Sequence, residues 1–208
     1  MEYAYSYGDP GRLYLNVTNR CTNRCSICIR SDRIGLGGSV LWGGPEPDLT
    51  ELEEAVGRRG GPGGFQEIIW CGFGEPTFRL DLIVEAAAWL RSRGATIRLN
   101  TNGHAALIHG RDVLPELAAA VDMVSVSLNA PSRRRYLELC LPDPDSAGAV
   151  PAPAPEDFWE AMLDFLTRSP AHFRNVQASV VGFALTGGEI ERCRALARSM
   201  GIERFRVR

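Results

Sequence analysis

One theme repeats along the chain: a short apolar run, a polar or glycine-rich turn, and then a segment with the apolar periodicity of an amphipathic helix. Strands that alternate with helices predict a parallel sheet joined by right-handed crossovers. We expect strands at Leu13–Val17, Glu67–Cys71, Thr96–Leu99, Met123–Leu128, Val176–Val181 and Arg204–Val207. The signature of two dinucleotide-binding halves is missing, so the pattern favours an α/β fold that forms an open, partial βα barrel of about six parallel strands.

Capping residues mark the ends of several expected helices. Thr50 and Glu53 have the spacing of a capping box, which predicts a helix through Val56. Gly94 and Gly201 follow two apolar-periodic segments, and glycine commonly ends a helix because it adopts the left-handed conformation. The other helices are expected at Asp81–Arg93, Asp112–Ala120, Ser132–Leu139, Glu156–Arg168 and Glu189–Met200.

Length and composition bound the organisation of the chain. Its 208 residues, 45% of them hydrophobic, suffice for one well-packed domain, so we expect residues 1–208 to form a single domain. The net charge of -2 gives no electrostatic footprint for nucleic acid. Met1–Pro10 lacks the apolar core of a secretory signal, and no apolar run reaches membrane-spanning length. We therefore expect a cytoplasmic protein without a membrane segment.

Three of the six cysteines are crowded into the turn after the first strand, with the spacing Cys-x3-Cys-x2-Cys. Cys21, Cys25 and Cys28 can wrap one loop around three corners of an iron–sulfur cubane. Ordinary cubane sites use four thiolates, so one iron is left open for chemistry. The alternative is a non-catalytic zinc-binding module, but zinc needs a fourth ligand; His104 is distant in sequence and no second Cys-x2-Cys pair exists. The spacing favours the cluster.

Small and polar residues follow the next three strands. The second strand leads into Gly72–Thr77, the third into Asn100–Gly103, and the fourth ends at Ser125–Asn129. In a βα barrel these turns share one face with the cysteine loop. Ser125, Ser127 and Asn129 alternate along the fourth strand and so lie on one side of it. This arrangement predicts room for a polar cofactor beside the cysteines.

These motifs together resemble the radical S-adenosylmethionine (SAM) superfamily. The resemblance rests on the cysteine spacing, Gly-Glu-Pro after the second strand, Thr-Asn-Gly after the third and Ser-x-Ser-Leu-Asn in the fourth, and it covers nearly the whole chain. Within the superfamily, Leu13–Arg30 and Val124–Pro142 resemble the TatD-associated radical SAM proteins. Members of that subgroup are encoded beside or fused to TatD-type metal-dependent hydrolases.

The resemblance implies two cofactors, a [4Fe-4S] cluster and SAM. Cys21, Cys25 and Cys28 would hold three irons, and the fourth would bind the amino and carboxylate groups of SAM. The other implied contacts are Gly74 and Glu75 with the amino group, Thr101 and Ser127 with the carboxylate, Asn129 with the ribose and Val181 with the adenine. Ile27 departs from the family, which usually has an aromatic residue before the third cysteine; an aliphatic side chain packs on adenine but does not stack.

The implied reaction is reductive cleavage of SAM to a 5′-deoxyadenosyl radical that abstracts hydrogen from a substrate. The implied partners are a low-potential electron donor of the flavodoxin or ferredoxin type and a TatD-type hydrolase. Three readings stay open within this chemistry: direct action on a small molecule or peptide, an activase that places a glycyl radical on a partner protein, and a deazaguanine-type synthase.

Other residues have a structural and a functional interpretation. Cys71 is interpreted as a buried structural thiol with a hydrogen-atom donor as the alternative, and Cys140 and Cys193 as core thiols. Arg133–Arg135 is interpreted as a solvated charge run rather than an anion grip. His104 is interpreted as an exposed loop residue, with acid–base chemistry as the alternative.

The sixth strand is expected to leave the barrel open. A full barrel has eight strands, so the sixth should present an unpaired edge. Arg204, Arg206 and Arg208 alternate there. We expect the opening to admit substrate, and the arginines either to protect the edge from self-pairing or to attract an anionic substrate or partner.

Overall fold

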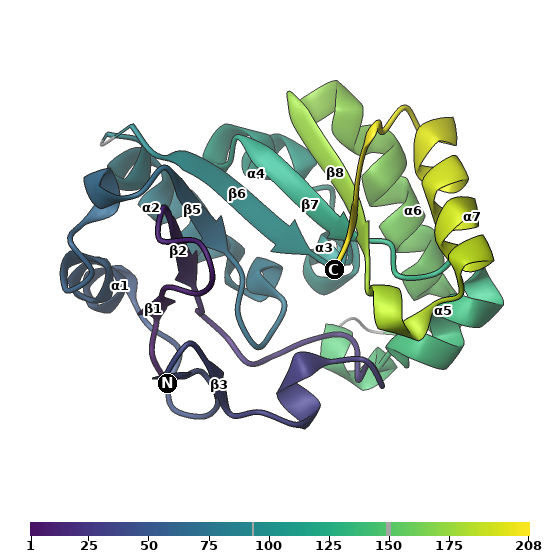
Figure 1. Cartoon of the computed structure of the whole chain (residues 1–208), viewed down its shortest axis with the longest axis horizontal. Helices are drawn as coiled ribbons and strands as arrows, with labels where there is room; N and C mark the ends of the chain where they lie inside the picture. The colour runs from purple at the N-terminus through teal and green to yellow at the C-terminus, as the bar shows by residue number, and fades with distance from the viewer. Residues whose placement is uncertain (93, 149–150) are drawn as a thin grey trace.

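A seven-stranded sheet forms the centre of the computed structural model, which describes residues 1–92, 94–148 and 151–208 (Figure 1). The strand order is β1-β2-β5-β6-β7-β8-β9. Strands β2 to β9 of this sheet run parallel, and β1 pairs antiparallel with β2. The bounds are β1 Ala4–Tyr5, β2 Arg12–Leu15, β5 Glu67–Trp70, β6 Thr96–Thr101, β7 Met123–Ser127, β8 Asn175–Val180 and β9 Arg204–Val207. The six expected strands are confirmed, in chain order.

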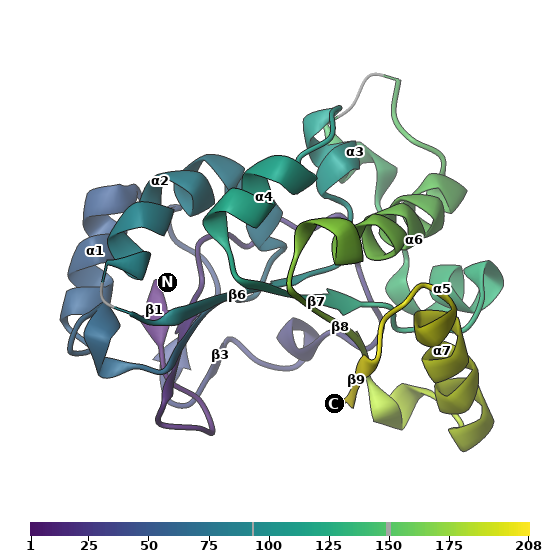
Figure 2. The ribbon, with the colours of Figure 1, turned by 90° about the horizontal axis from the view of Figure 1, so that it is seen from above.

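Helices connect the parallel strands. Figure 2 shows α1, α2, α4 and α6 on one face of the sheet, with the segment that carries β3 (Gly35–Leu36) on the opposite side. The helices are α1 Leu49–Gly57, α2 Leu80–Arg91, α3 Ala105–His109, α4 Leu114–Ala120, α5 Arg133–Cys140, α6 Pro155–His172 and α7 Gly187–Ser199. The 3-10 turns are η1 Ile29–Ser31, η2 Pro62–Gly64, η3 Pro76–Arg79, η4 Pro144–Ala147 and η5 Gly182–Ala184. This is the open βα barrel that the sequence predicts.

The core lies between the sheet and these helices. Alternate residues of strands β2, β5, β6, β7 and β8 face the helices, and most of them are buried and apolar, as the period of two in a strand predicts. These residues include Leu13, Leu15, Ile68, Trp70, Ile97, Leu99, Val124, Val126, Ala178 and Val180. Each fully buried large side chain contributes about 1.5–3 kcal/mol relative to exposure, so this face provides much of the stability of the fold.

Several helix boundaries differ from the sequence expectation, and the expected helix end at Arg93 lies outside the described residues. The capping box of α1 joins Asp48 and Glu51, not Thr50 and Glu53: the Glu51 N–H donates to Asp48 Oδ1 (2.8 Å) and the Asp48 N–H to Glu51 Oε2 (3.0 Å). Both pairs have the required spacing, and Asp is the better N-cap. Helix α6 continues past Arg168 to His172 and contains Pro170.

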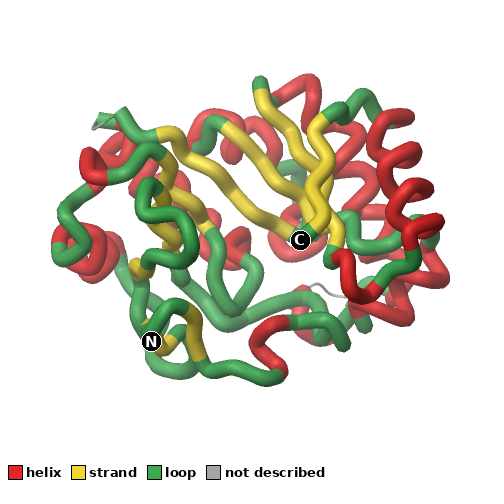
Figure 3. The backbone as a smooth tube through the Cα atoms, viewed as in Figure 1, coloured by secondary structure: helices red, strands yellow, loops and turns green. Residues whose placement is uncertain are grey.

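Several small elements were not expected from the sequence, among them the short helix α3, strand β1 and a two-stranded hairpin. Strand β1 covers the edge of β2 that a six-stranded barrel would leave free. Residues 35–40 form a hairpin in which β3 (Gly35–Leu36) pairs with β4 (Ser39–Val40). Figure 3 shows that the rest of the segment between β2 and α1 is mainly loop. Elements this short have too few residues to show a period.

The sheet does not close into a ring. Among the described residues, β9 pairs only with β8, and β2 pairs with β1 and β5. The expectation that the first and sixth parallel strands stay apart is therefore confirmed. Figure 1 shows β9 at the margin of the sheet opposite to β1 and β2.

Candidate functional site

The turn after β2 carries Cys21, Cys25 and Cys28, which are free and half-buried. The Cys28 N–H donates to the Cys25 carbonyl oxygen (3.1 Å), so the second half of the turn is tight. Burial, and after it the Glu75 carboxylate, raise the pKa of Cys21 to about 12, and burial raises that of Cys28. Within residues 1–92, 94–148 and 151–208, no group of three or more His, Cys, Asp or Glu side chains is arranged to hold a metal ion. Their role as ligands therefore stays a prediction.

The chemistry of the donors in this turn fits an iron–sulfur cluster. No His, Asp or Glu lies between Cys21 and Cys28, so the donors are thiols alone. Thiols bind metal only after losing their protons, and the positive charge of the irons offsets the cost of a thiolate in a half-buried position. Three such donors leave one iron of a cubane without a protein ligand.

The middle of the cysteine loop, at Arg24 and Ser26, is paired with the chain that ends α5. The Arg24 N–H donates to the Leu141 carbonyl oxygen and the Ser26 N–H to that of Leu139, both at 3.0 Å. This register places Cys25 opposite Cys140, and the contact with Cys140, followed by burial, raises the pKa of Cys25. The two stretches that carry the subgroup resemblance are thus bound to one another.

A buried histidine fastens the start of the same loop. His104 Nδ1 lies 2.7 Å from Thr22 Oγ1, and His104 Nε2 lies 2.9 Å from the Tyr136 hydroxyl. Asn102 Nδ2 also donates to Thr22 Oγ1 (2.8 Å). His104 is 0% exposed, so the interpretation as an exposed loop residue is wrong; the ring of Phe158 from α6 packs edge-on against it. Burial lowers the pKa of His104 to about 3, which keeps the ring neutral and suits it to hold the loop rather than to transfer protons.

Glu75 ties the turns after β5 and β6 together. Its buried carboxylate accepts hydrogen bonds from Thr77 N (3.2 Å), Thr77 Oγ1 (2.8 Å), Thr101 Oγ1 (2.8 Å) and Asn102 N (2.7 Å). Burial raises the pKa of Glu75, and these donors oppose that rise. The Glu75 N–H donates to the Arg20 carbonyl oxygen (2.8 Å), at the entrance of the cysteine loop.

Gly74 allows this close approach. A Cβ atom at Gly74 would overlap the carbonyl oxygens of Thr18 and Arg20, so only glycine brings the two backbones into contact here. The Gly-Glu-Pro motif therefore has a structural role in this chain: it presses the turn after β5 against the cysteine loop.

The remaining predicted cofactor contacts occupy neighbouring strand ends. Thr101 is buried, and its hydroxyl both donates to Glu75 and accepts from the Gly103 N–H (3.0 Å). Ser127 is half-buried and accepts from Arg208 Nη2 (3.0 Å).

Asn129 and Val181 follow the ends of β7 and β8. Asn129 has φ 57°, and its buried Oδ1 has no hydrogen-bond partner among the described residues. Its N–H donates to the Ser179 carbonyl oxygen (3.3 Å), which joins it to β8. Val181 is half-buried where the chain leaves β8 for η5. The structure thus brings Glu75 and Thr101 into contact and leaves Val181 on the β8 side.

The other cysteines behave differently from one another. Cys140 and Cys193 are buried, in agreement with the expectation of core thiols. Cys71 is only half-buried. Burial raises the pKa of Cys71, and an interaction with the Asn100 amide opposes that rise.

The three consecutive arginines of α5 are all paired with carboxylates. Arg133 lies 3.9 Å from Glu160, and Arg134 lies 3.7 Å from Glu138. Arg135 bonds Glu138 (3.2 Å), Glu189 (3.1 Å) and the Ala184 carbonyl oxygen (3.0 Å). These contacts agree with the charge-run interpretation, and Arg135 links α5 to α7.

Sequence reasoning missed the polar residues on the face of β6 away from the helices. Arg98 is buried there beside Asn100, and it pairs with Glu67 at 3.3 Å. The signal was present: Arg98 and Asn100 alternate with Ile97 and Leu99, just as the serines of β7 alternate with valines.

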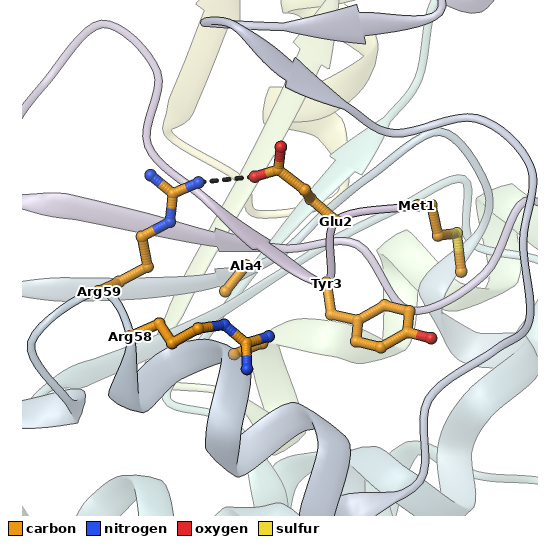
Figure 4. Close-up of a pocket in the computed structure, with 7 residues that line it drawn as sticks. Met1, Glu2, Tyr3, Ala4, Arg58 and Arg59 are labelled. Atoms are coloured by element: carbon orange, nitrogen blue, oxygen red, sulfur yellow. Dashed lines mark hydrogen bonds and ion pairs between the residues drawn. The ribbon is translucent and has the colours of Figure 1, made fainter.

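A cavity of about 430 Å³ lies away from all these residues. It is bounded by the N-terminal segment and the end of α1, where Arg59 pairs with Glu2 (Figure 4). Its lining consists of Met1, Glu2, Tyr3, Ala4, Ala55, Arg58 and Arg59. No predicted cofactor contact lines it.

Comparison with known proteins supports the interpretation of the motifs. The family described as the Radical SAM superfamily matches residues 15–197. No curated protein sequence matches the chain. No helix among the described residues combines the length and the apolar character needed to cross a membrane.

Several solved structures share the fold. They include SuiB of Streptococcus suis bound to the precursor peptide SuiA (TM-score 0.65, 13% identity, 95% of this chain and 39% of that one). TYW1 with a lysine-pyruvate adduct bound is also similar, with a TM-score of 0.58, 15% identity, and coverage of 92% of this chain and 62% of TYW1. HydG, a maturase of the [FeFe]-hydrogenase, has a TM-score of 0.56, 14% identity, and coverage of 91% of this chain and 37% of HydG. The chain spans less than two thirds of each of these proteins.

Proposed function

Because the chain belongs to the radical SAM superfamily, whose members are enzymes that bind a [4Fe-4S] cluster and SAM, we propose that Cys21, Cys25 and Cys28 hold that cluster here. The observation that carries the proposal is the cysteine loop itself: three free thiols in one turn, with no other metal-binding side chain between them. Once reduced by a low-potential electron donor, such a cluster would supply the one electron needed to cleave bound SAM to methionine and a 5′-deoxyadenosyl radical, the species that would abstract hydrogen from a substrate.

The protein's own residues hold the loop and the cofactor in place. Thr22 and the turn at Glu75 are fastened by buried hydrogen bonds, so the cysteine loop is ordered from both sides. The N–H of Glu75 is engaged with Arg20, and the amino group of SAM is a donor, so we propose that carbonyl oxygens of the turn at Gly74 and Glu75 bind it.

The other proposed SAM contacts follow the strand ends. Thr101 and Ser127 lie near the carboxylate in this proposal and Val181 near the adenine. The free Oδ1 of Asn129 is suited to accept a hydrogen bond from a ribose hydroxyl, since it is buried and has no partner among the described residues. Ile27, partly buried against the core, packs beside the adenine.

The partners we propose are those of the TatD-associated subgroup. They are a low-potential electron donor of the flavodoxin or ferredoxin type and a TatD-type hydrolase, with residues 1–208 acting as one domain. The hydrolase partner rests on the subgroup resemblance of Leu13–Arg30 and Val124–Pro142 alone.

Anaerobic reconstitution tests the proposal. Purified protein should contain about four irons and about four sulfides per chain. After reduction with dithionite it should convert SAM to 5′-deoxyadenosine and methionine without added substrate. Deuterium transfer from labelled candidate substrates into 5′-deoxyadenosine would then identify the substrate. One equivalent of zinc with no iron, and no cleavage of SAM, would instead establish the zinc-binding module.

A further inference from the structure

The cysteine loop and the chain that ends α5 form a short antiparallel ribbon. Asn23 and Pro142 pair in an antiparallel bridge. Each step forward along the loop is matched by one step back along the other chain, so Cys25 lies opposite Cys140. The backbone hydrogen bonds that set this register run from the Asp143 N–H to the Thr22 oxygen (2.9 Å), from the Arg24 N–H to the Leu141 oxygen (3.0 Å) and from the Ser26 N–H to the Leu139 oxygen (3.0 Å).

The two cysteines occupy a position in the ribbon where facing side chains come close together. Hydrogen-bonded and non-hydrogen-bonded pairs alternate along an antiparallel ribbon. The hydrogen bonds of Arg24 and Ser26 flank Cys25 on both sides. Cys25 and Cys140 therefore form a non-hydrogen-bonded pair, in which the Cα atoms are ordinarily about 4.5 Å apart. A disulfide spans Cα separations of about 4.4–6.8 Å, so the backbone holds these two thiols within its range.

Both thiols are free, and both belong to the same packed region. Cys140 is 0% exposed and is part of the core, and Cys25 packs against that core from the loop. The amide of Asn129 donates to Cys140 Sγ (3.8 Å). The hydrogen-bond contact with Cys140, followed by burial, raises the pKa of Cys25, in agreement with the register. Cys25 is half-buried, so it is the member of the pair that a reagent in solution can reach.

Cys140 competes with the proposed cluster for the sulfur of Cys25. In the part of the chain that the structure describes, no three His, Cys, Asp or Glu side chains converge on one point, so the sulfurs of the cysteine loop are not gathered around a common centre. A cubane needs each of its cysteine ligands as a thiolate. A sulfur that is bonded to Cys140 has no thiolate to offer, so Cys25 can serve the cluster or Cys140 but not both.

We propose that Cys25 and Cys140 form a disulfide in the cluster-free protein, and that this bond blocks cluster assembly until it is reduced. The oxidant is a low-molecular-weight disulfide such as oxidised glutathione. The Cys25 thiolate attacks it, which breaks the glutathione S–S bond, forms a mixed disulfide and releases one glutathione thiol. Cys140 then attacks the Cys25 sulfur and releases the second. The two cysteines together lose two electrons and two protons, which the two glutathione thiols gain.

The second part of this inference rests on the proposed function, because it names a regulation of the cluster site. The first part does not, since two thiols can form a disulfide whether or not the loop holds a cluster. The two parts are therefore tested by separate measurements.

Peptide mapping of the cluster-free full chain tests the disulfide. The protein is kept without oxygen in mixtures of reduced and oxidised glutathione until its composition no longer changes, because the raised pKa of Cys25 makes exchange slow. It is then alkylated and digested with trypsin. Cleavage after Arg24 and Arg135 places Cys25 and Cys140 in different peptides, which we expect to find linked until dithiothreitol is added. Trypsin leaves Cys25 and Cys28 in one peptide, so a Cys28→Ser chain that still shows the link assigns it to Cys25.

Iron uptake by the same samples tests the block. Supplied with iron and sulfide but no added thiol, wild-type protein should lose iron uptake in proportion to the linked fraction, and dithiothreitol should restore it. Peptide mapping at the end of each uptake shows how much of the link the sulfide has reduced. Cys140→Ser keeps the three proposed ligands and should take up iron equally before and after oxidation. Cys193→Ser, which removes the other buried thiol, is the matched control and should behave as the wild type does.

Several results would overturn the inference. A link between Cys25 and Cys28 in place of the link to Cys140 would do so, and so would full iron uptake by the linked protein. Equal loss of uptake in Cys140→Ser would assign the block to a disulfide within the cysteine loop. Circular dichroism checks that Cys140→Ser is folded, and peptide mapping of the wild type needs no variant at this buried position.

The failure of this inference differs from the failure of the proposed function. SAM cleavage by reduced, reconstituted protein reports on the cluster and SAM alone. Protein that cleaves SAM but never links Cys25 to Cys140 contradicts only the disulfide. Protein that forms the link, but in its reduced state neither takes up iron nor cleaves SAM, contradicts the proposed function and establishes the disulfide.

Discussion

The cysteine loop follows strand β2, and strand β9 forms an edge of the same sheet, but the two regions are held in different ways. The loop is fixed by buried hydrogen bonds through Thr22, by the turn at Glu75 and by pairing with the end of α5. Strand β9 has one neighbouring strand, and its arginines Arg204 and Arg206 are exposed. The difference indicates that the end of the sheet at the cysteine loop is preorganised, whereas the arginines of the edge strand form no ion pair with any residue that the structure describes.

The largest effect should come from the cysteine loop. Replacing Cys21, Cys25 or Cys28 with Ala should abolish the cluster absorbance near about 400 nm, because a cubane corner loses its thiolate. Cys140→Ala and Cys193→Ala should keep that absorbance after the same anaerobic reconstitution. If Cys193 proved as necessary as Cys25, the comparison would fail, because the ligands would no longer belong to one loop.

The buried histidine should make the cofactor end sensitive to acid. An ordinary histidine has a pKa of about 6.5, whereas that of His104 is lowered to about 3, so the unfolded chain binds a proton in this range that the folded chain does not. The neutral His104 ring stabilises the folded state fully above about pH 6.5, and this contribution to the free energy of unfolding is lost as the pH falls toward about 3. The total loss is about 4–5 kcal/mol at most, since one pKa unit corresponds to about 1.36 kcal/mol.

Urea unfolding of the apoprotein at a series of pH values measures this loss. His104→Asn lacks the titrating ring, so its free energy of unfolding should be lower at neutral pH but should change less as the solution is acidified. Parallel curves for wild type and His104→Asn would show that another group causes the acid sensitivity.

Ser127 ends β7, which lies between β2, the strand before the cysteine loop, and the edge strand β9. Its replacement tests whether the SAM site extends as far as β7. Ser127→Ala should weaken SAM binding by about 1–3 kcal/mol, because it removes a polar contact in a half-buried site. Equilibrium binding to the reconstituted protein measures the change, and Ser125→Ala, one step further into β7, is the matched control. Unchanged affinity with the cluster still present would place the SAM carboxylate elsewhere.

The smallest effect on stability should come from the exposed edge. Arg204→Gln combined with Arg206→Gln should change the free energy of unfolding by less than about 0.5 kcal/mol, since both side chains are exposed. If the arginines protect the edge, the variant should self-associate in analytical ultracentrifugation while its kinetics stay unchanged. If they attract an anionic substrate, the variant should stay monomeric and lose a salt-sensitive part of its substrate affinity.

Local patterns in the sequence determined the parallel strands, most of the helices and the spacing of the cysteines. These features follow from the periods of two and 3.6 and from short spacings, which a stretch of about ten residues already contains. The same reasoning misplaced the capping box of α1, because Asp48–Glu51 and Thr50–Glu53 have the same spacing and only the folded helix distinguishes them.

Only the tertiary structure decided what surrounds the cysteines. Asn23 meets Tyr136, and Thr22 meets His104, across separations of 113 and 82 residues. No local period encodes such contacts. They arise because parallel crossovers bring the ends of the strands to one face, where Tyr136 of α5 and Phe158 of α6 bury His104.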